Sequence, residues 1–153
     1  MPLLATKYFG AMDYREDSVF EFPFGLPAFE NETRFVPIES PESSPLLFLQ
    51  SLGQPGLCFL AFPILVIDRA YQLGVSGEDL AALEFDPDRQ PELGNEALVL
   101  ALISLHEGFS ATANLMAPIV VNVKTRRALQ AIRQDSFYSH QHPIDSPRGE
   151  GAC

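Results

Sequence analysis

The sequence contains few of the residues on which catalytic and metal sites rely. Its 153 residues include no tryptophan, two cysteines and three histidines. Cys58 lies in an apolar run and Cys153 is the last residue, so the two do not indicate a disulfide framework. No apolar run approaches the roughly 18 residues of a membrane-spanning helix, and no charged region precedes a long apolar stretch at the N-terminus. We therefore expect a cytoplasmic protein without a signal peptide or membrane span.

Positive charge is also scarce. Ten Lys and Arg stand against 20 Asp and Glu, which gives a formal net charge of −10. Binding to nucleic acid or to anionic lipid depends on basic side chains that neutralise phosphate. Lys124, Arg126 and Arg127 form a small basic group, but no aromatic residues are interleaved with them. We predict no direct contact with nucleic acid and no membrane partner.

Recognisable catalytic motifs are missing. The sequence has no Gly-x-Ser-x-Gly elbow, no P-loop and no Gly-x-Gly-x-x-Gly motif. His106 beside Glu107 offers a general base, although such a pair is typical of a strand end at the surface. His140 and His142 loosely imitate metal ligands, in a segment rich in Pro and Gly that is typical of a solvated tail. We predict no enzymatic activity, no metal and no cofactor.

The chain does have enough apolar material for one real core. Hydrophobic residues make up 46% of it, and 12 residues are Phe. Short apolar segments alternate with Pro and Gly, which is typical of strands and turns. A turn over 53–56 between two dense apolar runs predicts a hairpin. We predict strands over 20–22, 34–38, 46–52, 57–62, 64–67, 98–105, 117–123 and 129–133.

A single helix is predicted near residues 77–84. Ser76 is suited to the N-cap, Asp79 falls in the first turn, and Leu80 and Leu83 give the apolar side. Pro87 disfavours helical geometry in the residue before it. Many short strands with one short helix predict a mainly β fold, a compact single-domain antiparallel β-barrel. We assign residues 1–139 to the barrel and residues 140–153 to a flexible tail.

Acidic residues are concentrated before the strand expected at residue 98. Between residues 74 and 97 the only basic residue is Arg89. The acidic residues of this stretch are Glu78, Asp79, Glu84, Asp86, Asp88, Glu92 and Glu96. The stretch is either a solvated surface or a surface for a basic partner.

Three segments carry a resemblance to a known family. Residues 22–30 read FPFGLPAFE, after YFG at residues 8–10. Residues 45–51 read PLLFLQS and lead into PGLCF, and residues 110–122 read SATANLMAPIVVN, followed by RALQ. In order and spacing, from about residue 6 to residue 138, the chain resembles the FliW family of flagellar assembly factors. Ala28 stands where the family commonly has Gly; if that position needs a positive φ, Ala costs on the order of 1 kcal/mol.

The resemblance implies a function as well as a fold. Members of this family are compact antiparallel β-barrels of the cytoplasm that bind flagellin in a chaperone-like manner. They also bind CsrA, an RNA-binding translational regulator, and relieve its repression of flagellin translation by partner switching. We expect both partners here, and a monomer.

Candidate partner contacts follow from these expectations. We expect Glu84, Asp86 and Asp88 to face basic CsrA. Four residues of the family motifs are candidate contacts as well, namely Phe24, Phe29, Asn114 and Met116. Structural roles are the alternative. A loop shaped by Gly25 and Pro27 would return Phe24 and Phe29 to the core, and Asn114 would satisfy loop backbone groups.

Two other functions remain open. One is a barrel that binds a small molecule, such as a flavin or a lipid, in an interior made roomy by Ala and Gly. The other is an enzyme built on His106 and Glu107.

Overall fold

The structure is a computed structural model that describes residues 3–144. The chain is mainly β, and most strands are short. The strands are β1 (Leu3–Thr6), β2 (Gly10–Asp13), β3 (Phe20–Glu21), β4 (Arg34–Glu39), β5 (Leu47–Ser51), β6 (Cys58–Pro63), β7 (Ala97–His106), β8 (Phe109–Ala113), β9 (Ile119–Asn122), β10 (Ala128–Gln130) and β11 (His142–Pro143). The helical segments are η1 (Glu16–Ser18), α1 (Ile64–Ile67) and α2 (Gly77–Ala82).

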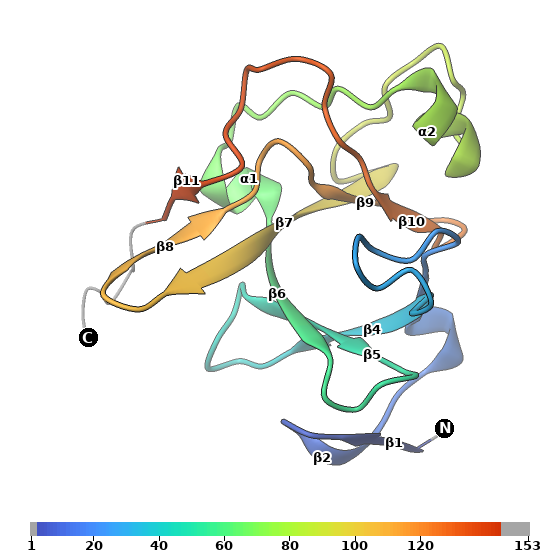
Figure 1. Cartoon of the computed structure of the whole chain (residues 1–153). Helices are drawn as coiled ribbons and strands as arrows, with labels where there is room; N and C mark the ends of the chain where they lie inside the picture. Colours follow the sequence, from blue (N-terminus) through green and yellow to red (C-terminus); the bar gives the residue numbers. More distant parts are fainter. Residues whose placement is uncertain (1–2, 145–153) are drawn as a thin grey trace.

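The main sheet is antiparallel and curls into a half-barrel (Figure 1). Its strand order is β10-β9-β7-β6-β5-β4-β3. The first and last strands of this path approach each other: the backbone N–H of Glu21 donates to the carbonyl of Arg126 at 2.8 Å, and Glu21 forms a parallel bridge with Arg127. The predicted fold class is thereby confirmed, with a sheet whose two ends are joined by one narrow contact.

Two apolar cores lie on opposite faces of the strands β7 and β9. Ile119 and Val121 face the barrel core, where Phe22, Phe35 and Leu49 are fully buried. Val120 points to the other side, into a second core beneath α2. Because both faces of β9 are covered, its apolar residues are continuous and do not alternate with polar ones.

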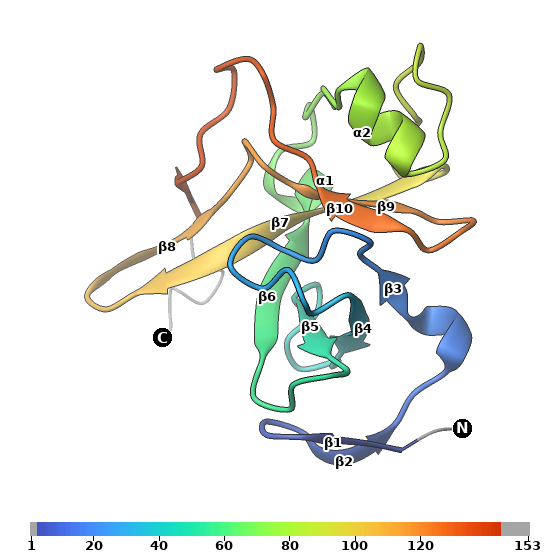
Figure 2. The ribbon, with the colours of Figure 1, turned by 45° about the vertical axis from the view of Figure 1, so that its right-hand side comes forward.

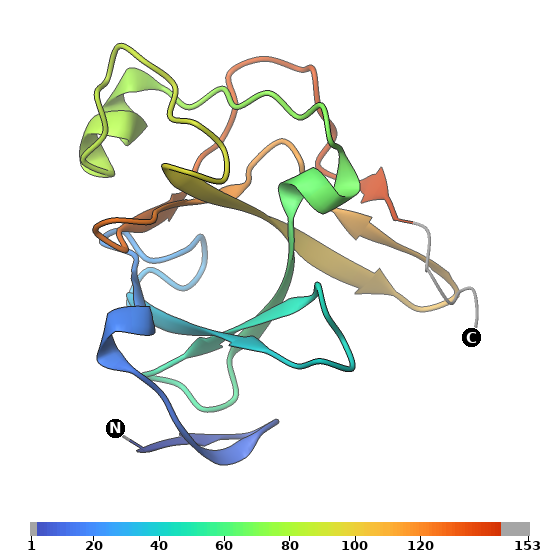
Figure 3. The same ribbon diagram turned by 180° about the vertical axis from the view of Figure 1, so that it is seen from behind.

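Strand β7 belongs to two sheets. Its first part pairs with β9 and β6 in the half-barrel, and its last part pairs with β8, which in turn pairs with β11. The register shifts between Ser104 and His106, as expected of a β-bulge. The β7–β8 hairpin therefore projects from the barrel as an arm (Figure 2), and α1 lies between β6 and this arm (Figure 3).

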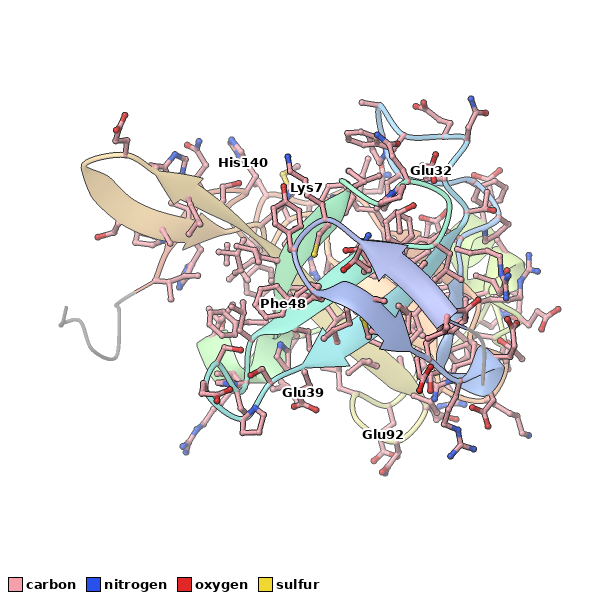
Figure 4. The ribbon with its side chains drawn as sticks, turned by 90° about the horizontal axis from the view of Figure 1, so that it is seen from below. Lys7, Glu32, Glu39, Phe48, Glu92 and His140 are labelled. Carbon is pink, nitrogen blue, oxygen red and sulfur yellow. The ribbon has the colours of Figure 1, made fainter. Side chains whose placement is uncertain are left out.

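The hairpin β1–β2 forms a separate two-stranded sheet. It lies across the outer face of β4, β5 and β6 (Figure 4). The backbone N–H of Lys7 donates to the carbonyl of Pro55 at 3.0 Å, and the rings of Phe9 and Phe48 meet edge to face at 5.2 Å. The hairpin thus covers a face of the barrel wall that would otherwise expose apolar side chains.

Most of the predicted elements are confirmed. The hairpin around residues 53–56 is the pair β5–β6, and the strands expected at 20–22, 34–38, 98–105, 117–123 and 129–133 correspond to β3, β4, β7, β9 and β10. Helix α2 begins as predicted, with the Ser76 hydroxyl accepting from the backbone N–H of Asp79 at 3.1 Å. The sequence did not predict β1, β2, β8, β11 or α1.

Two predictions require correction. Residues 64–67 form α1, one helical turn, and not a strand. Its first residue Ile64 is buried, whereas Leu65 and Val66 are exposed, and the backbone N–H of Asp68 donates to the carbonyl of Ile64. The apolar composition of this run predicts a strand. Its buried and exposed residues instead follow the pattern of a helical turn and do not alternate.

The tail predicted from His140 is the second correction. His142 and Pro143 form β11, and the backbone N–H of Ile144 donates to the carbonyl of Ala111. The start of this segment is therefore paired with β8. Residues 145–153 of the predicted tail, with Cys153, lie outside the described residues.

Candidate functional site

The acidic loop, residues 84–96, connects α2 to β7. Four of its carboxylates are on exposed residues: Glu84, Asp86, Asp88 and Glu92. None of these four takes part in an ion pair with another residue of 3–144. The predicted contacts Glu84, Asp86 and Asp88 are therefore brought together on one exposed loop.

Arg89 and Glu96 tie the middle of the acidic loop to its C-terminal end. Their side chains form a two-pronged ion pair, at 2.9 and 3.1 Å, and the Glu96 carboxylate also accepts the backbone N–H of Glu92 at 2.7 Å. The hydrogen bonds from Arg89 and then from Glu92 lower the pKa of Glu96 to about 2. The negative charge of the other four carboxylates remains available at the surface.

The acidic loop leaves α2 through a Schellman motif. The backbone N–H of Phe85 donates to the carbonyl of Leu80, and that of Glu84 donates to Ala81. Glu84 consequently has a φ of 67°, a left-handed conformation that glycine usually occupies at this position. The direction in which the loop leaves the helix is thus set by the backbone.

Side chains of the β9–β10 hairpin hold the end of α2. The buried Asn122 donates its Nδ2 hydrogen to the carbonyl of Leu83 at 2.8 Å, and Arg127 donates Nε–H to the carbonyl of Ala82 at 2.9 Å. Asn122 Oδ1 accepts from the backbone N–H groups of Lys124 and Thr125. One amide side chain thereby joins the β9–β10 hairpin to the end of α2, from which the acidic loop begins. A surface hollow of about 420 Å³ lies here, lined by Glu84, Phe85, Asp86, Arg89, Asn95, Glu96, Asn122, Val123 and Lys124.

The other predicted contacts are distributed between the core and the surface. Phe29 packs against the barrel core and meets Phe59 edge to face at 5.6 Å, as its structural role predicts. The same prediction is wrong for Phe24, whose exposed fraction is 60%. The loop geometry explains the difference: Gly25 turns the chain so that Phe22 and Leu26 point inward and Phe24 is left outside.

Asn114 has the structural role that its position predicts. Its Oδ1 accepts the backbone N–H groups of Met116 and Ala117, at 3.1 and 2.9 Å. Met116 is half-buried, and its carbonyl accepts from the backbone N–H of Arg133. These bonds hold the turn that leads into β9.

Arg133 is a buried charge that the sequence pattern did not indicate. Its guanidinium donates to the carbonyl of Gln72 at 2.6 Å, to the Tyr71 hydroxyl at 3.2 Å and to both carboxylate oxygens of Asp135. It also lies over the ring of Tyr138, 4.8 Å from the centroid. The Asp135 carboxylate raises the pKa of Arg133, so the cation remains charged inside this cluster. The cluster fastens the segment after α1 to the segment after β10.

An apolar groove runs beside the arm. It has a volume of about 340 Å³ and is lined by Pro45, Phe62, Val66, Ile67, His142, Pro143 and Ile144. Strand β11 borders it and pairs with β8 on one side only in the part of the chain that the structure describes. The groove therefore combines exposed apolar side chains with a short strand edge that has no second partner among residues 3–144.

Potential catalytic and metal-binding groups are not gathered into a site. His106 Nε2 lies 3.0 Å from the Thr112 hydroxyl on the arm, and Glu107 is exposed at its tip. Within residues 3–144, His, Cys, Asp and Glu side chains form no group of three or more that could hold a metal ion. Burial raises the pKa of the Cys58 thiol, which disfavours the reactive thiolate. The same residues contain no helix long and apolar enough to cross a membrane.

Comparisons with known proteins agree on one family. The family model described as FliW protein matches residues 3–144. The chain is 34% identical over 152 residues to the flagellar assembly factor FliW of Bacillus velezensis, covering 99% of both chains. It is 32% identical over 143 residues to that of Bacillus subtilis, covering 93% of this chain and 96% of the relative. A crystal structure of the flagellar assembly factor FliW is similar with a TM-score of 0.79 and 27% identity, covering 93% of this chain and 96% of the other.

Proposed function

Because the chain belongs to the FliW family of flagellar assembly factors, we propose that it acts in the cytoplasm as a partner-switching regulator of flagellin supply. In this function it binds newly made flagellin as a chaperone would. It also binds the RNA-binding translational regulator CsrA and so relieves repression of flagellin translation. Flagellin that accumulates occupies the factor and releases CsrA, and exported flagellin reverses this exchange.

The acidic loop is the observation that carries the proposal. An RNA-binding regulator must present basic side chains to phosphate. Glu84, Asp86, Asp88 and Glu92 offer four exposed carboxylates without an ion-pair partner among residues 3–144. Complementary charge of this kind accelerates encounter and excludes partners of the same sign. We therefore place CsrA on the acidic loop.

Charge reversal tests this placement. The variant Glu84→Lys/Asp86→Lys/Asp88→Lys is expected to weaken CsrA binding at low salt at least tenfold, mainly through slower association. The matched control reverses three exposed carboxylates outside the loop, Glu39, Glu42 and Glu107, and has the same net charge. Equal affinity of the two variants, measured by isothermal titration, would show that the loop is only a solvated surface.

The apolar groove beside the arm is the place we propose for flagellin. A chaperone covers apolar segments of its client, and a helix or strand could pack against Val66 or add to the free edge of β11. Val66→Glu is expected to weaken flagellin binding, whereas Ile132→Glu is a control with a similarly exposed apolar residue, 55% against 57%. Equal loss of flagellin binding in both variants, or no loss in either, would mean that flagellin binds to another surface.

The exchange itself is measured by titrating CsrA into the factor with and without bound flagellin. Flagellin that abolishes or strongly weakens CsrA binding is the expected outcome. In this proposal CsrA lies on the acidic loop, from which β7 begins, and flagellin lies in the groove beside the arm, in which β7 ends. Simultaneous binding with undiminished affinities would refute the switch and leave two independent binding functions.

A further inference from the structure

The loop of residues 22–30, here named the Phe24 loop, has a fixed backbone. The backbone N–H of Gly25 donates to the carbonyl of Phe22 at 2.9 Å, and that of Phe29 donates to Leu26 at 2.7 Å. Gly25 has a φ of 63°, and a Cβ at this position would lie 2.5 Å from the carbonyl oxygen of Glu30. The loop thus closes on itself so tightly that only glycine fits at its turn.

This fixed loop presents one aromatic ring to solvent. Phe22 and Leu26 on either side are buried in the barrel core, whereas Phe24 is largely exposed. Burying a Phe ring in a core stabilises the fold, and Phe24 does not contribute in this way. Exposed aromatic residues on rigid elements are common among the residues that dominate protein–protein contacts.

A hollow of about 260 Å³ lies next to the Phe24 ring. Its apolar walls come from Phe24, Pro27 and Leu129, and the remaining lining residues are Gly25, Glu30, Asp79 and Gln130. The hollow therefore joins three segments that are distant in sequence, namely the Phe24 loop, the first turn of α2 and β10. Two carboxylates and one aromatic ring border it, and no lysine or arginine of residues 3–144 does.

The two carboxylates have different environments. Glu30 accepts the backbone N–H of Ala28 at 3.1 Å. Burial raises the pKa of Asp79, an effect that the Ser76 hydroxyl partly offsets. Neither carboxylate belongs to an ion pair within the described residues. A cation entering the hollow would therefore offset the electrostatic cost of burying the Asp79 carboxylate, and it would displace no ion-pair partner of either residue within residues 3–144.

We propose that this hollow is a receptor for an arginine or lysine side chain of a protein partner, which lies on the Phe24 ring and points its charge toward Glu30 and Asp79. The apolar walls accommodate the methylene groups of the guest, and the ring face and carboxylates stabilise its cation. The net charge of −10 favours the approach of a basic segment. The inference concerns a different surface from the acidic loop and the apolar groove, and it holds whichever basic protein is the partner.

The test uses the full chain and a small defined probe. The ¹⁵N-labelled protein is titrated with the capped tripeptide acetyl-Ala-Arg-Ala-amide, and in parallel with the same peptide carrying citrulline, the neutral analogue of arginine. Chemical-shift changes are expected in residues 23–30, 77–80 and 128–131, and the arginine peptide should bind at least threefold more tightly than the citrulline peptide. Higher salt should reduce this difference.

Variants separate the hollow from general charge attraction. Phe24→Ala and Asp79→Asn should each lower the association constant for the arginine peptide at least threefold. Phe137→Ala and Glu107→Gln remove an exposed ring and an exposed carboxylate elsewhere and should leave it unchanged. Native-like spectra of each variant confirm that it is folded. Shifts centred on other residues, equal binding of the citrulline peptide, or equal effects of variant and control would overturn the proposal.

Discussion

Asn122 is expected to be the most sensitive polar residue of the surface that carries the acidic loop. Its side chain is 5% exposed and makes three hydrogen bonds. Asn122→Ala removes the donor to the carbonyl of Leu83, which is itself fully buried, and the acceptor of two backbone N–H groups in the β9–β10 turn. Water can reach the turn, where Lys124 and Thr125 are exposed, but it cannot easily reach Leu83.

The expected loss follows from this difference. A buried carbonyl left without a partner costs about 1–3 kcal/mol, and the two solvated amides add up to about 1 kcal/mol together. Asn122→Ala should therefore lower the free energy of unfolding by about 1–4 kcal/mol, measured by urea denaturation. Asn95→Ala removes an exposed hydrogen bond to Glu92 and serves as the control, with an expected loss of about 0.5 kcal/mol or less.

A second substitution at the same position changes only the donor. Asn122→Asp keeps the acceptor for the turn but directs a carboxylate at the carbonyl of Leu83. Burial, and repulsion between the carboxylate and this carbonyl oxygen, should raise the folded-state pKa of the new carboxyl above its unfolded value of about 4. The protonated carboxyl can donate a hydrogen bond to the carbonyl of Leu83. The stability that this hydrogen bond contributes is fully present below the unfolded-state pKa and is lost as the pH rises through the folded-state pKa. The penalty relative to the unaltered chain should be largest at pH 7 and smaller at pH 4. A penalty that does not change with pH, or a loss below about 1 kcal/mol for Asn122→Ala, would refute this account of the amide.

Two further changes test individual backbone and charge effects. Ala28 is exposed and has a φ of 71°, so Ala28→Gly should stabilise the chain by about 0.5–1 kcal/mol and raise its melting temperature by about 1–4 °C; a lower melting temperature would contradict the strain assigned to Ala28. Arg89→Met removes the main cause of the low pKa of Glu96, which should rise from about 2 toward the ordinary value of 4.5 in a carbon-detected NMR titration. Because the folded-state pKa of Glu96 is lowered, the stability it contributes is present above its unfolded pKa and is lost as the pH falls toward 2. The difference in stability between Arg89→Met and the unaltered chain should therefore disappear near pH 2. A difference that persists there would mean that Arg89 stabilises the chain through a contact other than the one with Glu96.

The sequence predicts those parts of the fold that depend on local chemistry. The hairpin around residues 53–56 follows from turn residues between apolar runs, and α2 follows from Ser76 and the acidic residues of its first turn. The family motif also indicates that Ala28 replaces a residue suited to positive φ, and its φ of 71° confirms this.

The remaining features depend on tertiary contacts that local patterns do not contain. Residues 64–67 have the composition of a strand, but the chain leaves the sheet after Pro63 and makes a helical turn that buries Ile64. Strand β11 is two residues long and exists because β8 offers it an edge. Phe24 and Phe29 look equivalent in the sequence, and only the folded loop separates one in solvent from one in the core.

The candidate functional residues also divide into those that the sequence predicts and those that it does not. Clustering of Glu84, Asp86 and Asp88 on one loop could be predicted because they are neighbours in sequence. The hollow beside Phe24 could not, since Asp79 and Leu129 reach it from separate elements. Arg133 gives only a weak signal in the sequence, because its partners Gln72 and Tyr71 precede it by a long stretch of chain.

The narrow contact between Glu21 and Arg127 has a consequence for how the chain is made. During synthesis β3 leaves the ribosome early and β10 leaves it late. The contact between them can therefore form only after most of the chain has been made. Pairing between such distant segments slows folding, and an uncovered strand edge is a template for aggregation while it lasts. This flagellar assembly factor is thus itself prone to aggregation until its sheet has closed. We expect the slowest step of its refolding to coincide with hydrogen-exchange protection of the Glu21 amide.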